Sequence, residues 1–210
     1  MNVASTNPAR AIEILDRVML VGLLLTIPLL LHAHGFAEAS IAVVGLSFLG
    51  RSAILREWGW LRTPWVGMAL VWWGWLTLCS LPIPALGLGE GGARSLTQAL
   101  MTIRFIVMAA AMEHCILRDH AARRWLYGLI AASVAYMSFG CLFQFTFGRN
   151  MYGWPRFVDG ELTGPFGTPR AGPVMARLMM PAVLPPIMAL LGRRAVRPAL
   201  GALALLAGSV

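Results

Sequence analysis

The sequence predicts an all-α, polytopic membrane protein. Of its 210 residues, 58% are hydrophobic and only 12% are charged, which is about half the charged fraction of a typical soluble domain. The mean hydropathy is +0.71. So few charges cannot cover a water-facing surface, so we expect apolar helices that face lipid. This composition excludes a disordered chain, an ordinary nucleic-acid-binding domain and a secreted disulfide scaffold.

Six apolar stretches are long enough to cross a bilayer, because about 20 helical residues cover a hydrocarbon core of about 30 Å. The expected spans are residues 18–35, 37–55, 64–82, 95–117, 125–147 and 173–191. A seventh stretch from Pro198 to Val210 makes only about 20 Å of helix, so we expect a truncated span. The predicted organisation is an N-terminal segment (1–17), a five-span bundle (18–147), an external loop (148–172), and the sixth span with the truncated seventh (173–210).

The arginines predict the orientation of these spans. The chain has 17 basic residues and no lysine, and its net charge is +8. Eleven arginines lie before the first span or in the gaps after the second, fourth and sixth, and four lie in the other gaps. This alternation is the positive-inside pattern, so the N-terminus is predicted to be cytoplasmic. The tripeptide Ala37-Glu38-Ala39 also permits a signal-peptide cleavage site, although the long leader that precedes the first span contains two acidic residues.

No cofactor or metal is expected. Cys79, Cys115 and Cys141 lie within apolar stretches without CxxC or Cys/His spacing. This placement favours small buried side chains over a zinc site or a disulfide. His32 and His34, at the outer end of the first span, are possible catalytic bases.

The loop 148–172 is rich in glycine and proline, which predicts turns. Its four aromatic residues are Tyr152, Trp154, Phe157 and Phe166. Aromatic faces beside hydrogen-bonding groups suit sugar rings. An interfacial aromatic belt is the alternative for Tyr152 and Trp154. The loop carboxylates Asp159 and Glu161 are candidate acid or base groups.

Two arginines lie inside predicted spans, Arg104 in the fourth and Arg177 near the outer end of the sixth. A charged side chain near the bilayer centre costs at least about 2.5–3.5 kcal/mol on insertion scales, so both are functional candidates. Arg170 and Arg177 would share a helix face. Together with Arg104 they would suit the phosphate oxygens of a lipid-carrier diphosphate. The alternatives are a salt bridge for Arg104 and snorkelling for Arg177.

Residues 156–191 carry a family resemblance. Within them, Gly164-Pro-Phe-Gly-Thr-Pro-Arg170 precedes an apolar helix that contains Met-Met-Pro. Gly164, Phe166 and Pro169 match a Gly-x-Phe-x-(Asn or His)-Pro-Asn stretch, from which Thr168 and Arg170 differ. In this the chain resembles the O-antigen ligase and O-antigen polymerase family of bacterial membrane glycosyltransferases, in which the stretch lies at the outer mouth of a span that follows five others.

The resemblance implies a GT-C-like fold in the bacterial inner membrane, with about twice this chain's spans and with the loop 148–172 in the periplasm. The donor would be a polysaccharide on undecaprenyl diphosphate, and the acceptor a lipid A–core sugar or a growing glycan. Neither metal nor nucleotide nor nucleic acid would take part, and membrane lipids would surround the chain. The implied substrate-binding residues are Arg104, Arg156, Arg170, Arg177, Trp154 and Phe166, with Gly164, Phe166 and Pro169 as the motif.

In that family a Ser-Arg-Gly stretch and a histidine base follow in later segments, beyond Val210. We therefore expect the catalytic base to lie outside this chain and the chain alone to be inactive. Two other functions remain open. One is a transporter or flippase for lipid-linked anions, which predicts inverted repeats that the sequence does not display. The other is a non-catalytic membrane scaffold.

Overall fold

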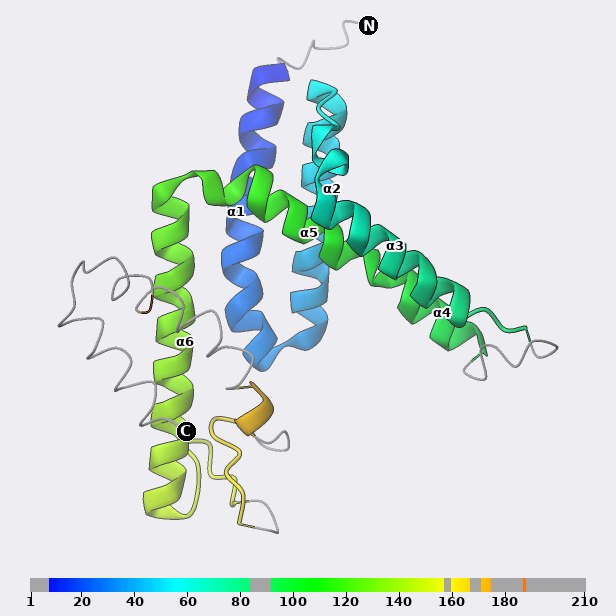
Figure 1. Cartoon of the computed structure of the whole chain (residues 1–210). Helices are drawn as coiled ribbons and strands as arrows, with labels where there is room; N and C mark the ends of the chain where they lie inside the picture. The colour runs from blue at the N-terminus through cyan, green and yellow to red at the C-terminus, as the bar shows by residue number, and fades with distance from the viewer. Residues whose placement is uncertain (1–7, 84–91, 157–159, 167–170, 175–186, 188–210) are drawn as a thin grey trace, which may run out of the picture. The chain divides into compact units, whose positions relative to one another are not determined.

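The computed structural model describes residues 8–83, 92–156, 160–166, 171–174 and 187 (Figure 1). The regular elements within these ranges are all helical, and they contain no strand apart from an isolated bridge between Arg149 and Pro155. The named elements are α1 (Pro8–His32), α2 (His34–Leu55), the 3₁₀ helix η1 (Gly59–Arg62), α3 (Pro64–Cys79), α4 (Gly92–Met101), α5 (Ile103–His114), the 3₁₀ helix η3 (Ile116–Arg118) and α6 (His120–Phe147). The predicted all-α class is confirmed.

Four helical stretches are long and apolar enough to cross a membrane, which indicates a multi-pass membrane protein. They are Pro8–His32, Gly35–Leu55, Gly92–Arg118 and His120–Phe147, and they correspond to the first, second, fourth and fifth predicted spans. The predicted sixth span and seventh stretch lie almost entirely outside the described residues.

The third predicted span, 64–82, is shorter than we expected. Helix α3 has 16 residues, which give about 24 Å of helix against a hydrocarbon core of about 30 Å. It begins with Pro64 at its first position, where the missing N–H costs nothing. It ends two residues before Leu81-Pro82, because proline disfavours helical geometry in the residue that precedes it. The count of six full spans is therefore not confirmed.

The chain divides into two compact units, each described here by itself. The first contains residues 1–26 and 35–123, with α2 to α5 and most of α1. Helices α1 and α2 pack closely at Gly22, where an added Cβ would lie 2.8 Å from Val44 Cγ2. Ser40 Oγ donates to the Gly22 carbonyl at 2.7 Å, and Thr26 Oγ1 lies 3.1 Å from Ser40 Oγ. Small residues and hydroxyl groups of this kind are typical of helix contacts in membranes.

A turn of 3₁₀ type separates α4 from α5 at Thr102. The Thr102 amide donates to Ala99 and its carbonyl accepts from Phe105, both with three-residue spacing. Trp73 on α3 donates its Nε1–H to the Ala99 carbonyl at 3.0 Å, so α3 packs beside this turn. The predicted fourth span is therefore one helical stretch with an interruption two residues before Arg104.

The second unit contains residues 27–34 and 124–210, and its described part is α6 with the chain that follows it. A small core forms from Leu31, Met137, Phe166 and Ala171. Gly140 lets the later chain approach α6, because an added Cβ would lie 3.1 Å from Pro165 Cδ. The predicted external loop therefore folds back onto the C-terminal half of α6.

Candidate functional site

Gln144 is a buried amide at the end of α6 that holds the start and the end of the described loop together. Its side chain has no solvent exposure. Its Nε2 donates to the Pro155 carbonyl at 3.2 Å and to Thr163 Oγ1 at 2.9 Å. Its Oε1 accepts from the amides of Thr163 and Gly164 at 2.8 and 3.0 Å. One side chain thus fixes both flanks of the segment between Pro155 and Thr163.

Asn150 is a second buried amide, 3% exposed, and it connects the aromatic turn to the motif. Its Oδ1 accepts from the backbone amides of Tyr152 and Trp154 at 3.0 and 2.8 Å. Its Nδ2 donates to the carbonyls of Gly164 and Phe166, both at 3.0 Å. The Asn150 side chain thus makes two donations and two acceptances, which is its full hydrogen-bonding capacity. Residues 150–154 and 164–166 therefore form one rigid structure.

The turn that Asn150 holds presents two aromatic side chains outward. Tyr152 is 60% exposed and Trp154 is 54% exposed. The Tyr152 hydroxyl lies 3.0 Å from the hydroxyl of Tyr136 on α6. The His32 ring lies 5.6 Å from the Tyr136 ring and 5.9 Å from the Phe166 ring. The exposed Tyr152 side chain therefore meets the Tyr136 hydroxyl, and the Tyr136 ring in turn contacts the His32 ring.

Gly164 and Phe166 are the two residues of the predicted motif that the structure describes. Gly164 has a φ of +59°, a conformation that favours glycine, and an added Cβ would lie 3.2 Å from Cys141 Sγ. Phe166 is buried in the small core with Leu31 and Met137. The described part of the motif thus shapes and anchors the loop, and Phe166 contacts the protein interior.

Arg156 is bound to the end of α6. Its Nε donates to the Gln144 carbonyl at 3.4 Å, and its Nη2 donates to the Phe145 carbonyl. The guanidinium also lies over the Phe145 ring, 5.3 Å from the centroid. A cation on the last carbonyls of a helix satisfies them and complements the helix dipole. In this structure Arg156 thus stabilises the helix terminus, and its predicted role in substrate binding stays a prediction.

Arg104 lies in the first unit and pairs with Glu38, at 3.0 Å between Nη2 and Oε1. Its guanidinium lies 5.1 Å from the Phe105 ring centroid, and its buried Nε has no hydrogen-bond partner. The salt bridge that the sequence left open for Arg104 is therefore present. Pro169, Arg170 and Arg177, like Phe157 and Asp159, lie outside the described residues, so the predicted arginine cluster stays a prediction.

The site residues that sequence reasoning missed are the two amides, Gln144 and Asn150. Gln144 lies near the end of the apolar stretch 125–147, and Asn150 follows that stretch. Both resemble ordinary polar residues at the boundary of a span. The one available indication was the number of glycines and prolines nearby, because such a loop needs side-chain partners for its backbone groups. The three cysteines are free.

The described residues hold no cluster of three His, Cys, Asp or Glu side chains that could hold a metal ion. The site offers two exposed aromatic rings on a hydrogen-bonded turn, with the Tyr136 hydroxyl beside Tyr152. No protein-family model, curated protein sequence or solved structure matches the chain.

Proposed function

We propose that this chain is part of a membrane glycosyltransferase of the O-antigen ligase or polymerase type. It would act at the periplasmic face of the bacterial inner membrane on a polysaccharide carried by undecaprenyl diphosphate. The acceptor would be a lipid A–core sugar or a growing glycan. The observation that carries the proposal is Asn150, which joins the exposed aromatic turn to the Gly164–Phe166 part of the motif.

A rigid aromatic turn fits a glycan ligand for an energetic reason. Sugar rings present an apolar face to stack on an aromatic ring and hydroxyl groups for polar neighbours. Because the backbone of Tyr152 and Trp154 is already fixed by Asn150, binding orders little more than two side chains. An interfacial belt needs exposed aromatic rings but has no need for a fixed backbone beneath them.

The diphosphate of the carrier would require cationic groups. Arg104, Arg170 and Arg177 are our candidates. Arg104 would exchange Glu38 for a phosphate oxygen, which guanidinium binds in the same bidentate way as a carboxylate. Such a preorganised charge would stabilise the departing diphosphate.

The test is binding of a lipid-linked oligosaccharide to the whole chain in lipid nanodiscs, with undecaprenyl diphosphate without a sugar as the comparison. We expect W154A to weaken glycan binding about three- to tenfold, as loss of a favourable aromatic contact would, and to leave binding of the bare carrier unchanged. Trp125, 70% exposed on α6, provides the matched control W125A. Equal glycan affinity in W154A, W125A and the wild type would contradict the proposal.

The transporter alternative predicts a different result in the same preparation. A flippase for lipid-linked anions moves the carrier between leaflets, so a fluorescent lipid-linked glycan in vesicles would become protected from an external quencher. Movement between leaflets that W154A does not affect would favour that alternative over the glycosyltransferase.

A further inference from the structure

The first unit contains a cavity of about 510 Å³ beside the C-terminal end of α2, on the predicted cytoplasmic side. Three arginines line it, Arg51, Arg56 and Arg118, and Glu57 is its one carboxylate. Arg51 is already paired, at 2.9 Å from Asp16 Oδ1 and 3.6 Å from Glu57 Oε2. Two positive charges therefore remain on the cavity wall.

Arg56 and Arg118 carry this excess charge. Neither has an ion-pair partner within the ranges that the structure describes. Asp119, which follows Arg118 in sequence, accepts from the Ala121 amide at 3.0 Å and so caps the start of α6. Two exposed guanidiniums at one cavity, without a carboxylate partner among the described residues, favour an anion between them.

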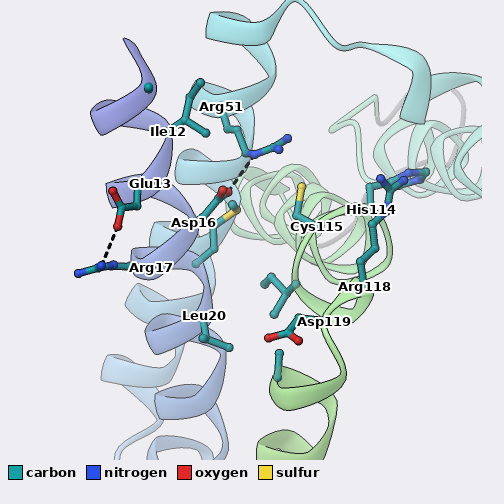
Figure 2. Close-up of a pocket in the computed structure, with 14 residues that line it drawn as sticks. Ile12, Glu13, Asp16, Arg17, Leu20, Arg51, His114, Cys115, Arg118 and Asp119 are labelled. Carbon is teal, nitrogen blue, oxygen red and sulfur yellow. Dashed lines mark hydrogen bonds and ion pairs between the residues drawn. The ribbon is translucent and has the colours of Figure 1, made fainter. Parts of the chain in front are cut away.

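A neighbouring cavity of about 500 Å³ shows the contrast (Figure 2). It shares Arg51 and Arg118 with the first, but three acidic side chains also line it. Arg17 pairs there with Glu13 at 2.6 Å, and Arg51 pairs with Asp16. Two of the three arginines of that cavity therefore have carboxylate partners, whereas Arg56 beside the first cavity has none in the described part of the chain.

The backbone at Arg56 is the second observation. Arg56 has a φ of +53°, and it is the one non-glycine residue with positive φ among those described. It follows the last residue of α2, and the Glu57 amide donates to the Ser52 carbonyl at 3.0 Å. This is a Schellman end, in which glycine normally occupies the left-handed position because it has no Cβ. Arginine there is conformationally unfavourable, so its side chain needs a compensating role.

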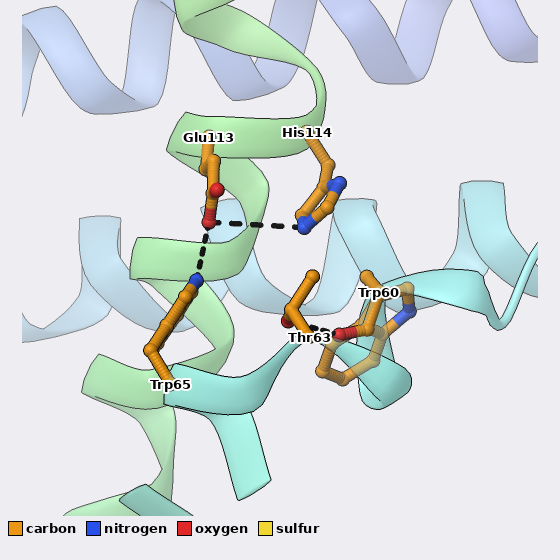
Figure 3. A network of polar contacts seen from close by, with 5 residues as sticks. All are labelled: Trp60, Thr63, Trp65, Glu113 and His114. Carbon is orange, nitrogen blue, oxygen red and sulfur yellow. Dashed lines mark hydrogen bonds and ion pairs between the residues drawn. The ribbon is translucent and has the colours of Figure 1, made fainter. Parts of the chain in front are cut away.

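Buried, unpaired nitrogen atoms in two of the residues that line the cavity are the third observation. Trp60 is 8% exposed and packs on Phe48 with ring centroids 5.2 Å apart, yet its Nε1–H has no hydrogen-bond partner. The Nε2 of His114 also lacks one: it lies 3.8 Å from Glu113, which accepts a 2.5 Å hydrogen bond from Trp65 instead (Figure 3). Buried donors without partners are rare in native proteins.

We infer that this cavity binds the phosphate group of an anionic ligand. Arg56 and Arg118 supply the charge. Phosphate has the oxygen geometry that arginine binds with two parallel hydrogen bonds. The site is distinct from the aromatic turn of the proposed function, and it depends on none of its chemistry. A lipid headgroup and a soluble phosphate ester share this chemistry.

The variant R56G gives the sharpest test, because it removes a charge and places glycine where the backbone favours it. We expect the whole chain to keep or gain thermal stability and to bind phosphate roughly tenfold more weakly, as loss of a charge-assisted hydrogen bond does. R118Q should weaken binding similarly. R62Q removes an exposed arginine of η1 that does not line the cavity and should bind as the wild type does.

The probes are glycerol phosphate in solution and phosphatidylglycerol in phosphatidylcholine nanodiscs, with binding followed by calorimetry and by native mass spectrometry. Binding of phosphatidylglycerol alone, lost in R56G but not R62Q, assigns the site to a lipid headgroup. Binding of both probes with the same loss assigns it to phosphate esters in general. Absence of binding by the wild type, or equal binding by R56G and the wild type, would overturn the inference.

Discussion

Replacing Asn150 with alanine should release the aromatic turn from the motif while α6 stays intact. The substitution removes four hydrogen bonds. Water can replace the amide oxygen for the partly buried N–H groups of Tyr152 and Trp154. The two donations to the buried carbonyls of Gly164 and Phe166 therefore set a lower bound of about 2 kcal/mol, and all four bonds set an upper bound of about 4 kcal/mol.

Hydrogen exchange of the Trp154 amide measures this change directly, because the amide exchanges when the turn opens locally. A loss of about 2–4 kcal/mol should speed its exchange on the order of 30- to 1,000-fold. The control is Q98A, which removes an exposed amide from α4. Wild-type exchange at Trp154 in N150A would refute the reasoning, since Asn150 would then not hold the turn.

The variant N150D separates the two halves of the clamp. Aspartate keeps the oxygen that accepts from Tyr152 and Trp154 and loses the amide that donates to Gly164 and Phe166. We therefore expect exchange near Trp154 to stay close to the wild type, and exchange across residues 160–166 to accelerate. Equal acceleration in both segments would mean that the turn and the motif open together.

Three further experiments test the packing. G22L should lower the free energy of unfolding by about 1–3 kcal/mol through the clash with Val44, and V44A should restore part of it; unchanged thermal unfolding of G22L would show that α1 and α2 are not in this contact. G164A should destabilise the loop by about 1–2 kcal/mol because of its positive φ, measured as faster proteolysis there. R104Q and E38Q, combined in a double-mutant cycle, should give a coupling energy of about 1 kcal/mol or less. A coupling energy of zero would show that the two side chains do not form an ion pair.

The helices were predictable because the features that define them are local. A run of about 20 apolar residues predicts a membrane helix wherever the rest of the chain lies, and the ends of α2 and α6 fall close to the predicted ones. The short α3 shows where composition alone fails. The predicted span continued through residues 80–82. However, Pro82 disfavours helical geometry in the residue before it, and α3 ends at Cys79.

The site was only partly predictable because its contacts join residues far apart in sequence. Gly164 and Phe166 were found from a motif, without any knowledge of what they touch. Gln144 accepts from Thr163 and Gly164, about 20 residues away, and nothing beside Gln144 in sequence indicates this. In the sequence, Arg156 similarly resembled a free cation. In the structure, its side chain donates to the Gln144 carbonyl in the last turn of α6.

Arg56 breaks a local rule at a helix end that the sequence nevertheless predicted correctly. Arginine occupies the left-handed position where glycine is usual, yet α2 ends at Leu55, as the apolar pattern predicted. Departures of this kind concentrate where a side chain has another task.

The two amide clamps assign the loop's shape and its outward chemistry to different residues. Gln144 and Asn150 set the backbone path from the inside, whereas Tyr152 and Trp154 point outward and contribute to that path only through main-chain amides. Exchanging either ring for another side chain would leave every clamp bond in place. Substitutions at these two positions could thus change ligand specificity in related chains with almost no cost to folding stability.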